Sequence, residues 1–527
     1  MISAYTGTQV RTAEEPLLAA GLGGVLMQRA AHGLAAGIIN ELRTRGRRLY
    51  GARVVVLTGK GNNGGDGLFA AALLAGRGMR TTAVLTSDGA HTDALAAFER
   101  AGGRVHRLAP ETLPKLAAEA AGADVVIDAV MGTGARGGLR GSAADLATAL
   151  LAAHRPGLVV ACDLPSGVDA DTGEAAGPVL PADLTVTFGA AKAGLLADPG
   201  ADYAGRVQVV PIGIEKYLPM PSLRRLDPED LGALLPSPPR RAHKYSRGVL
   251  GIVAGSADYP GAAVLACRGA LAAGAGMVRY LGPPAVADLV RQSCPEVVCS
   301  TGSVADNRVQ AWLVGSGMGP GDHEQLKRAR DAVASGLPIV ADAGALPALP
   351  DILAPQVVLT PHAGELAALL TRLGADTGRE AVEAGTLAAV RRAAGLTEAT
   401  VLLKGATTLV ASPFQDFYSQ SDGTPWLATA GSGDVLAGVI GALLAQVGSD
   451  VGRFRDAGID PDEHWAAIAA LGAALHGLAG RSASEARWGG PITAGVIADA
   501  IPDAWGKVSM LSSVGFPERH SRGQRLR

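Results

Sequence analysis

The sequence predicts an α/β protein of two domains, and three observations carry this prediction. Short runs rich in Val, Ile and Leu alternate with Ala- and Leu-rich stretches of helical length, as in repeated βα units. The 527 residues exceed what one ordinary hydrophobic core accommodates. Residues 215–248, rich in Pro and charge, interrupt the alternation. We place the junction there, with domains at 1–220 and 221–510, and expect a disordered tail at 511–527.

Composition excludes several classes of protein. Hydrophobic residues make up 48% and charged residues 18%, which excludes a disordered chain. The net charge of −2 provides no basic field, so we expect neither a nucleic-acid nor a membrane partner. We identify no signal peptide, and no run reaches 18 apolar residues. The four cysteines form no CxxC pair and are expected to be reduced. We therefore expect a cytoplasmic enzyme, and further expect a homo-oligomer.

In the first half, five apolar segments predict parallel strands that are buried on both faces, because their Val, Ile and Leu content is nearly continuous. Helices are expected between them, at 68–77 and 143–154. The five strand segments are 53–59, 81–87, 123–130, 157–165 and 183–189.

The segment TGKGNNGGDGLFAA (58–71) follows the first of these strands and opens a helix. Glycines at such a junction let backbone amides approach a phosphate, and the helix N-terminus adds positive potential. A tight turn alone would also account for the glycines. Asn62, Asn63 and Asp66 are polar groups that a bare turn does not need, so we favour a functional site. It is not a P-loop, because no Lys-Ser/Thr follows.

Two further strand ends carry a carboxylate. VIDAVMGTGARGG (126–138) contains Asp128, and VVACDLPSGVDADTG (159–173) contains Asp163. A carboxylate at the end of a buried strand is unfavourable unless it is paired or binds a cation. Either residue could be a helix cap, but ligands of open α/β sheets bind at these strand ends. We therefore interpret the pair as part of one site.

The segments GKGNNGGDG, DAVMGTGARGG and DLPSGVDADTG resemble, in order and spacing, the signatures of NAD(P)H-hydrate epimerases over about residues 10–215. The resemblance implies a Rossmann-like fold and a bound potassium ion. It implies acid/base chemistry by Asp163, and potassium bound by the oxygen atoms of Asn63, Asp128 and Ser166. The residues that it implies for binding the hydrated dinucleotide are Asn62, Asn63, Gly64, Gly65, Asp66, Gly132, Thr133, Gly134, Ala135, Arg136, Gly137, Gly138 and Asp163.

The second half repeats the alternation, and its most informative segment is LATAGSGDVLAGVIGALLA (427–445). Backbone amides at such a helix N-terminus can bind a phosphate. Asp434 could accept the proton of a hydroxyl nucleophile while the glycine amides stabilise the phosphoryl oxygens. The alternative is an aspartate favoured by the helix dipole. We favour phosphoryl transfer. The strand segments of this half are 248–256, 311–317, 337–344, 356–361 and 400–405.

TPHAGE (360–365), KGATT (404–408) and GSGDVLAG (431–438) together resemble ADP-dependent NAD(P)H-hydrate dehydratases of the ribokinase-like superfamily, over about residues 225–505. The resemblance implies a ribokinase-like sheet, Mg²⁺ with ADP as co-substrate, and catalysis by Asp434. It implies that Ala262, Gly317, His362 and Asp434 face the hydrate, and that Lys404, Gly405, Ala406, Thr407, Thr408 and Gly433 face the nucleotide.

Two positions depart from the family patterns. Gly59-Lys60-Gly61 stands where epimerases usually have GPG, which adds a donor near the phosphates. Ala430 replaces the first glycine of GGSGD, but Gly431 and Gly433 retain the anion-binding turn. Neither change removes a proposed ligand.

Together the resemblances predict a bifunctional enzyme that repairs hydrated NADH and NADPH. The R and S hydrates would be epimerised, and the S hydrate dehydrated to NAD(P)H with AMP and phosphate as co-products. One alternative is a ribokinase-like vitamin or sugar kinase with a non-catalytic accessory N-domain. In another, the N-domain is a binding or scaffolding module. A stable phosphorylated product would identify the kinase.

Overall fold

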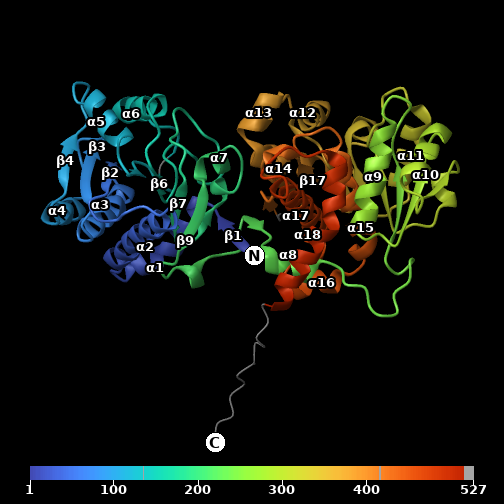
Figure 1. Cartoon of the computed structure of the whole chain (residues 1–527), viewed down its shortest axis with the longest axis horizontal. Coiled ribbons are helices and arrows are strands. Elements are labelled where there is room, and N and C mark those ends of the chain that lie inside the picture. The colour runs from blue at the N-terminus through green and yellow to red at the C-terminus, as the bar shows by residue number, and fades with distance from the viewer. Residues whose placement is uncertain (135, 415–416, 515–527) are drawn as a thin grey trace, which may run out of the picture. The chain divides into compact units, whose positions relative to one another are not determined.

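A computed structural model of the chain describes residues 1–134, 136–414 and 417–514 (Figure 1). None of the helices in these ranges combines the length and apolar character that crossing a bilayer requires. The chain divides into two compact units. The first comprises Ser3–Leu223 with Glu383–Leu387, and the second comprises Met1–Ile2, Arg224–Val382 and the residues from Ala388 onward.

The first unit is built on a parallel sheet. Its strands are β2 (Arg53–Thr58), β3 (Arg80–Leu85), β4 (Arg104–Arg107), β5 (Val125–Ala129), β6 (Val159–Cys162), β7 (Leu184–Phe188) and β9 (Arg206–Val210). Their order is β4-β3-β2-β5-β6-β7-β9, and neighbours are parallel throughout. The order reverses between β2 and β5, as in doubly wound dinucleotide-binding folds. Outside this sheet, β1 (Ile2–Tyr5) pairs in parallel with β8 (Ala191–Lys192).

Helices cover both faces of this sheet (Figure 1). Val54 and Val56 of β2 pack into one hydrophobic cluster and Val55 and Leu57 into another, as the alternation of a strand requires. The first cluster contains residues of α2, α3 and α4, and the second contains residues of α5 and α6. The helices are α1 (Gly7–Ala19), α2 (Gly23–Thr44), α3 (Asn62–Ala75), α4 (Thr92–Arg100), α5 (Leu113–Ala121), α6 (Gly141–Ala152) and α7 (Gly200–Ala204).

The helix expected at 68–77 begins earlier than predicted, at Asn62. A Cβ at Gly59 would lie 2.0 Å from the carbonyl oxygen of Val130, and one at Gly64 would lie 2.1 Å from that of Gly59. Glycine is required here because backbone meets backbone at the end of β2. The propensity of these glycines suggested a loop, but tertiary packing makes them the first turn of α3.

The second unit contains a larger, mixed sheet. Its strands are β10 (Leu223–Arg225), β11 (Val249–Val253), β12 (Met277–Leu281), β13 (Val298–Ser300), β14 (Ala311–Val314), β15 (Ile339–Ala341), β16 (Val357–Leu359), β17 (Thr400–Leu403), β18 (Thr408–Ala411) and β19 (Phe417–Gln420). Their order is β13-β12-β11-β14-β15-β16-β17-β18-β19-β10. Strands from β13 to β17 are parallel, and β17, β18 and β19 are antiparallel. The predicted α/β class is therefore confirmed for both halves of the chain.

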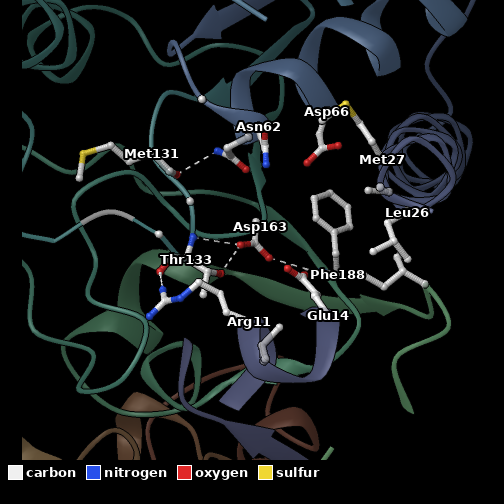
Figure 2. A pocket seen from close by; sticks show the side chains of 18 of the residues that line it. Arg11, Glu14, Leu26, Met27, Asn62, Asp66, Met131, Thr133, Asp163 and Phe188 are labelled. Atoms are coloured by element: carbon white, nitrogen blue, oxygen red, sulfur yellow. Dashed lines mark hydrogen bonds between the residues drawn. The ribbon is translucent and has the colours of Figure 1, made fainter. Parts of the chain in front are cut away.

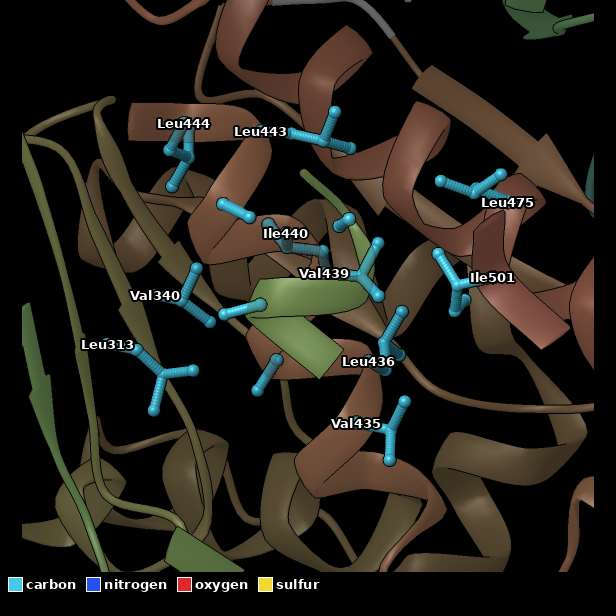
Figure 3. Close-up of a cluster of buried hydrophobic side chains, with 14 of the residues drawn as sticks. Leu313, Val340, Val435, Leu436, Val439, Ile440, Leu443, Leu444, Leu475 and Ile501 are labelled. Atoms are coloured by element: carbon cyan, nitrogen blue, oxygen red, sulfur yellow. The ribbon is translucent and has the colours of Figure 1, made fainter. Parts of the chain in front are cut away.

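The core of this unit surrounds α15, which is apolar on all sides (Figure 3). Val439 and Leu443 lie in this cluster with Leu313 of β14 and Val340 of β15. The helices of the second half are α8 (Pro228–Leu234), α9 (Pro260–Ala272), α10 (Pro284–Ser293), α11 (His323–Ala334), α12 (Ala363–Arg372), α13 (Arg379–Ala384), α14 (Thr386–Thr397), α15 (Ser432–Val447), α16 (Val451–Asp456), α17 (His464–Glu485) and α18 (Ala494–Val514).

Short 3-10 helices complete the fold: η1 (Ala193–Leu195), η2 (Glu215–Tyr217), η3 (Val304–Asp306), η4 (Ala343–Ala348), η5 (Pro425–Leu427) and η6 (Pro461–Glu463). The segment 511–527, predicted to be a tail, begins inside α18, which continues to Val514. Residues 515–527 lie outside the described residues.

Replacing Gly438 with Ala should destabilise the second unit. An added Cβ would lie 2.2 Å from the carbonyl oxygen of Ala266 in α9, and backbone cannot yield there as a flexible side chain would. We expect a loss of about 1–3 kcal/mol in the free energy of unfolding, the usual range for overpacking. Urea unfolding followed by tryptophan fluorescence measures it, because all five tryptophans lie beyond residue 300.

Gly395→Ala is the matched control, because it adds the same methyl group in α14, where nothing lies within 4 Å. It should stabilise the helix by up to about 1 kcal/mol. Equal stability of the two variants would contradict the close contact of α9 and α15.

Candidate functional site

The first unit contains a pocket of about 590 Å³ beyond the carboxyl ends of β2, β5 and β6 (Figure 2). This is where the strand order reverses, and its volume suits a small-molecule ligand. The predicted dinucleotide-binding residues that line it are Asn62, Asn63, Asp66, Gly132, Thr133, Gly134 and Asp163. Gly64, Gly65, Arg136, Gly137 and Gly138 lie outside its lining, and Ala135 lies outside the described residues.

Asp163 follows β6 and is the centre of a buried polar network. The Nζ atom of Lys192 donates to its Oδ1 at 2.5 Å, and also to Thr187 Oγ1 and to the carbonyl oxygen of Phe188, each at 2.9 Å. The hydroxyl and amide of Thr133 donate to Asp163 Oδ2. Burial by itself raises the pKa of Asp163, but Lys192 and Thr133 outweigh burial and hold it below its ordinary value. Asp163 is therefore ionised within the pocket.

The backbone of Asp163 is in the left-handed region, with φ of 68°. A residue other than glycine holds this conformation only where its surroundings over-determine it. Asp163 donates its N–H to Val186 of β7, and the Leu164 amide donates back to Cys162. The sharp turn directs the carboxylate into the pocket (Figure 2).

Two further carboxyl groups, Glu14 of α1 and Asp66 of α3, point into the same pocket (Figure 2). Burial raises the pKa of both groups, the charge of Asp163 raises them further, and Lys192 opposes these effects. Asp66 Oδ1 is buried without a hydrogen-bond partner among the described residues. The pocket thus presents one ionised carboxylate and two carboxyl groups whose pKa values are raised.

The three predicted potassium ligands lie in one connected group. The amide of Ser166 donates to Asp128 Oδ2 at 2.8 Å and its hydroxyl to Oδ1 at 2.6 Å. Ser166 Oγ accepts from the Met131 amide, and Asn63 Nδ2 donates to the Met131 carbonyl oxygen, each at 2.9 Å. Burial raises the pKa of Asp128, and the bonds from Ser166 oppose this. In the described part of the chain, no group of three or more His, Cys, Asp and Glu side chains forms a metal centre.

In the second unit, side chains that follow three strands, β14, β16 and β17, converge on Asp342, the residue after β15. Ser316, after β14, donates to its Oδ2 at 3.1 Å. Thr360, after β16, and Lys404, after β17, donate to its Oδ1, each at 2.9 Å. Lys404 Nζ also lies 3.8 Å from a Glu365 oxygen. Burial lowers the pKa of Lys404, but Asp342 and Glu365 reverse this and raise it above the ordinary value.

The GSGD segment forms the first turn of α15 beside this network. Gly431 caps the helix with φ of 85°, a conformation suited to glycine. A Cβ on Gly433 would lie 3.6 Å from Lys404 Nζ, so the ammonium group stands next to the loop. Burial and the negative charge of Asp342 raise the pKa of Asp434 to about 6, against the opposing effects of Ser316 and Lys404. Asp434 is therefore a better base than an ordinary aspartate.

The remaining predicted residues lie around this centre. A Cβ on Gly317 would lie 2.5 Å from that of Ala262, so these two are in contact. His362 caps α12 by accepting from the Gly364 and Glu365 amides, and forms a β-bridge with Lys404. Of the turn after Lys404, Gly405 and Ala406 are exposed, Thr407 is buried and Thr408 begins β18.

Comparison with known proteins identifies the family. The family model described as YjeF-related protein N-terminus matches residues 23–194, and that described as NAD(P)H-hydrate dehydratase matches 250–503. A Mycobacterium tuberculosis protein named bifunctional NAD(P)H-hydrate repair enzyme Nnr is 44% identical over 449 residues, which cover 84% of this chain and 89% of the relative. The chain belongs to the family of bifunctional NAD(P)H-hydrate repair enzymes.

Further relatives carry the same name. The repair enzyme of Moorella thermoacetica is 35% identical over 483 residues, covering 85% of this chain and 87% of that protein. A Bacillus subtilis structure of an ADP/ATP-dependent NAD(P)H-hydrate dehydratase, co-crystallised with ATP/Mg²⁺, is 26% identical with a TM-score of 0.46 and covers 54% of this chain and 98% of that chain. Family membership confirms the resemblance that the motifs suggested.

The sequence did not predict several polar residues of the two sites in this repair enzyme. Lys192 and Glu14 in the first site and Asp342 in the second lie outside the glycine-rich motifs. Two of them carried a signal in the sequence: Lys192 is a lone charge in the apolar run FGAAKAGLL, and Asp342 directly follows the apolar run LPIVA. Each of these two charged side chains requires a partner of opposite charge if it is buried. The sequence did not predict that Lys192 pairs with Asp163 or that Asp342 pairs with Lys404, because the partners are distant in sequence.

Lys192→Met should destabilise the first unit at neutral pH by about 3–5 kcal/mol, because it leaves the buried Asp163 carboxylate unpaired. The deficit should shrink as pH falls from 7 to 5. Without Lys192 the pKa of folded Asp163 rises, so the folded variant takes up a proton that the parent does not. Urea unfolding followed by circular dichroism measures this, and tryptophan fluorescence identifies the transition of the second unit.

Arg104→Met is the control within the same unit. It breaks the exposed pair with Glu119 and should cost under about 1 kcal/mol, with little change in the deficit between the two pH values. A Lys192→Met deficit that does not depend on pH would contradict the assigned charge state of Asp163.

Proposed function

We propose that the first unit interconverts the R and S epimers of hydrated NADH and NADPH, and that the second unit dehydrates the S epimer with ADP. The observation that carries the proposal is a reactive carboxylate beside a glycine-rich helix N-terminus in each unit, in a chain of the repair-enzyme family. A repair enzyme needs both steps, because a dehydratase specific for one epimer leaves the other behind.

In the first site, the ionised Asp163 is suited to accept a proton from the hydrated nicotinamide ring, with Lys192 balancing its charge. Lys60, after β2, and Asn62 and Asn63, in the first turn of α3, line the pocket and are suited to bind the dinucleotide phosphates. The predicted dinucleotide-binding set, including Gly64, Gly65 and Gly132 to Gly138, stays a prediction.

Potassium is the ion that best fits Asn63, Asp128 and Ser166. Asp128 is a buried carboxylate whose hydrogen bonds come from neutral donors, so a cation there would offset its charge. The ligand atoms are oxygens, with one carboxylate among them, which suits a weakly charged hard cation better than zinc. The ion would order the loop from Met131 that lines the pocket.

Potassium should therefore slow amide hydrogen exchange in residues 128–134 and 163–167 relative to lithium at equal ionic strength. Bound ligand stabilises the folded state that it selects, so the protection should saturate with potassium concentration. Asp128→Asn should abolish the difference between the salts. Identical exchange of the parent protein in the two salts would exclude a potassium site.

In the second site, Asp434 is suited to accept the proton of the 6-hydroxyl group as that oxygen attacks the β-phosphorus of ADP and AMP leaves. Phosphate then departs with the oxygen, the ring loses a proton, and the double bond of NAD(P)H forms. Lys404 and the amides of Gly431 to Gly433 are suited to stabilise the phosphoryl oxygens. Mg²⁺ would arrive on the nucleotide phosphates, since it usually keeps several waters and binds substrate phosphates.

The kinase and scaffold alternatives are not favoured, because the relatives that span most of the chain are named bifunctional repair enzymes. We propose ADP as the co-substrate, with residues 404–408 and Gly433 contacting it and Ala262, Gly317 and His362 contacting the hydrate. We place the reaction in the cytoplasm, which the reduced state of the four cysteines favours. The homo-oligomer stays a prediction.

Asp163→Asn and Asp434→Asn should separate the two activities. Asp434→Asn should lower ADP-dependent formation of NADH by about 10²–10⁴-fold, the usual contribution of an acid/base group, while epimers still interconvert. Asp163→Asn should leave dehydration of the S hydrate intact. With mixed epimers it should give a fast phase followed by a slow phase limited by spontaneous epimerisation. Absorbance of the reduced nicotinamide measures both.

The Asp163→Asn variant needs a control for folding. Because Asp163 neutralises the buried Lys192, its substitution also weakens the first unit, so circular dichroism must show that the variant is folded at the assay temperature. Near-normal dehydration by Asp434→Asn, or consumption of both epimers at the parent rate by Asp163→Asn, would refute the roles proposed for these residues.

A further inference from the structure

Asp342 occupies the centre of the strand ends in the second unit and accepts hydrogen bonds from both sides. Ser316 reaches it from the preceding strand of the sheet, and Thr360 and Lys404 from the following two. Its side chain is 3% exposed. Such a carboxylate is stable in the interior only because an ammonium group and two hydroxyls satisfy it.

The backbone around Asp342 is closely packed. A Cβ on Gly315 would lie 1.9 Å from the carbonyl oxygen of Asp342, so the loop after β14 lies directly against it. The next residue, Ala343, has φ of 43°, a conformation that alanine adopts only under constraint. The backbone that carries Asp342 is therefore constrained, and Lys404 reaches Asp342 from the end of β17.

Charges on three elements face one another here. Asp434, from α15, faces Ser316, Asp342 and Lys404. In the first turn of α15, Ser432 Oγ lies 3.3 Å from His476 Nε2 of α17. Burial lowers the pKa of His476 to about 4, so this histidine is neutral. Lys404 thus lies near two carboxylates, the buried Asp342 and the half-buried Asp434, and its 2.9 Å bond goes to Asp342.

We propose that Asp342 is a positioning residue of the dehydratase site, which anchors Lys404 beside the GSGD loop and keeps it from pairing with Asp434. The inference rests on the function proposed for this site. A lysine free to pair with Asp434 would hold that carboxylate as a poor base and would be drawn away from the phosphoryl group. Anchored on Asp342, it leaves Asp434 free to accept the proton of the substrate hydroxyl.

The test is the pH dependence of ADP-dependent NADH formation from the S hydrate. In the parent enzyme, activity should fall on the acid side as Asp434 is protonated, with a midpoint near its pKa of about 6. Asp342→Asn retains the shape and removes the charge. Its acid midpoint should move down by about one pH unit, the usual size of such a charge effect. Its kcat should also fall, by about ten- to a hundredfold, because Lys404 is misplaced.

Lys404→Gln should move the acid midpoint in the opposite direction, to higher pH, because it removes the positive charge near Asp434. This variant keeps the inference testable if Asp342→Asn does not fold. Glu365→Gln is the matched control, since it removes a carboxylate 3.8 Å from Lys404 that is not among the charges shifting the pKa of Asp434. Its acid midpoint should stay within a few tenths of a unit of the parent value.

Opposite shifts in the two variants support the positioning role. An unchanged midpoint in a folded Asp342→Asn enzyme, or in Lys404→Gln, overturns it. Recovery of Asp342→Asn activity by excess Mg²⁺ also overturns it, because Asp342 would then be a metal ligand. A parent enzyme that forms no NADH from the hydrate with ADP would instead refute the proposed function.

Discussion

Burying a carboxylate at the carboxyl end of a parallel strand is the constraint on which both sites depend. An ion taken out of water is stable only if a counter-charge and hydrogen bonds replace its hydration. The first unit supplies Lys192 to Asp163, and the second supplies Lys404 to Asp342. In both, hydroxyl groups from neighbouring strand ends complete the shell. The parallel sheet makes this arrangement available, since its strand ends meet at one edge.

Both sites contain a lysine paired with an aspartate, but the pKa of the candidate base differs between them. In the first unit the lysine binds the candidate catalytic aspartate itself, and the pKa of Asp163 falls below its ordinary value. In the second unit the lysine binds a supporting aspartate, and the pKa of Asp434 rises to about 6. A carboxylate of higher pKa is the stronger base, which suits the deprotonation of a hydroxyl group. Burial raises the pKa of both aspartates, and the direct pairing with Lys192 reverses that effect at Asp163 alone.

Glycine contributes to these sites through close contact of backbones as well as through turns. Gly59 and Gly64 bring the first turn of α3 against the end of β2 and the loop after β5, beside the pocket. Gly438 lets α15 lie on α9, and this packing holds the helix whose first turn carries Asp434. Any side chain at these positions would separate the elements that position the reactive groups.

The sequence by itself determined the α/β class, the family and the ten strand segments with the most continuous apolar runs, because strand hydrophobicity and glycine-rich motifs are local properties of the chain. Edge strands such as β4 (Arg104–Arg107) and β9 (Arg206–Val210) lack such a run and were not predicted. It also placed Asp163 and Asp434 at a strand end and a helix start. Only the tertiary structure decided which lysine pairs with which buried aspartate. Asp163 and Lys192 are 29 residues apart, and Asp342 and Lys404 are 62 apart. Pairs at such separations meet only once strand order and register are set, and the electrostatics of both sites depends on those meetings.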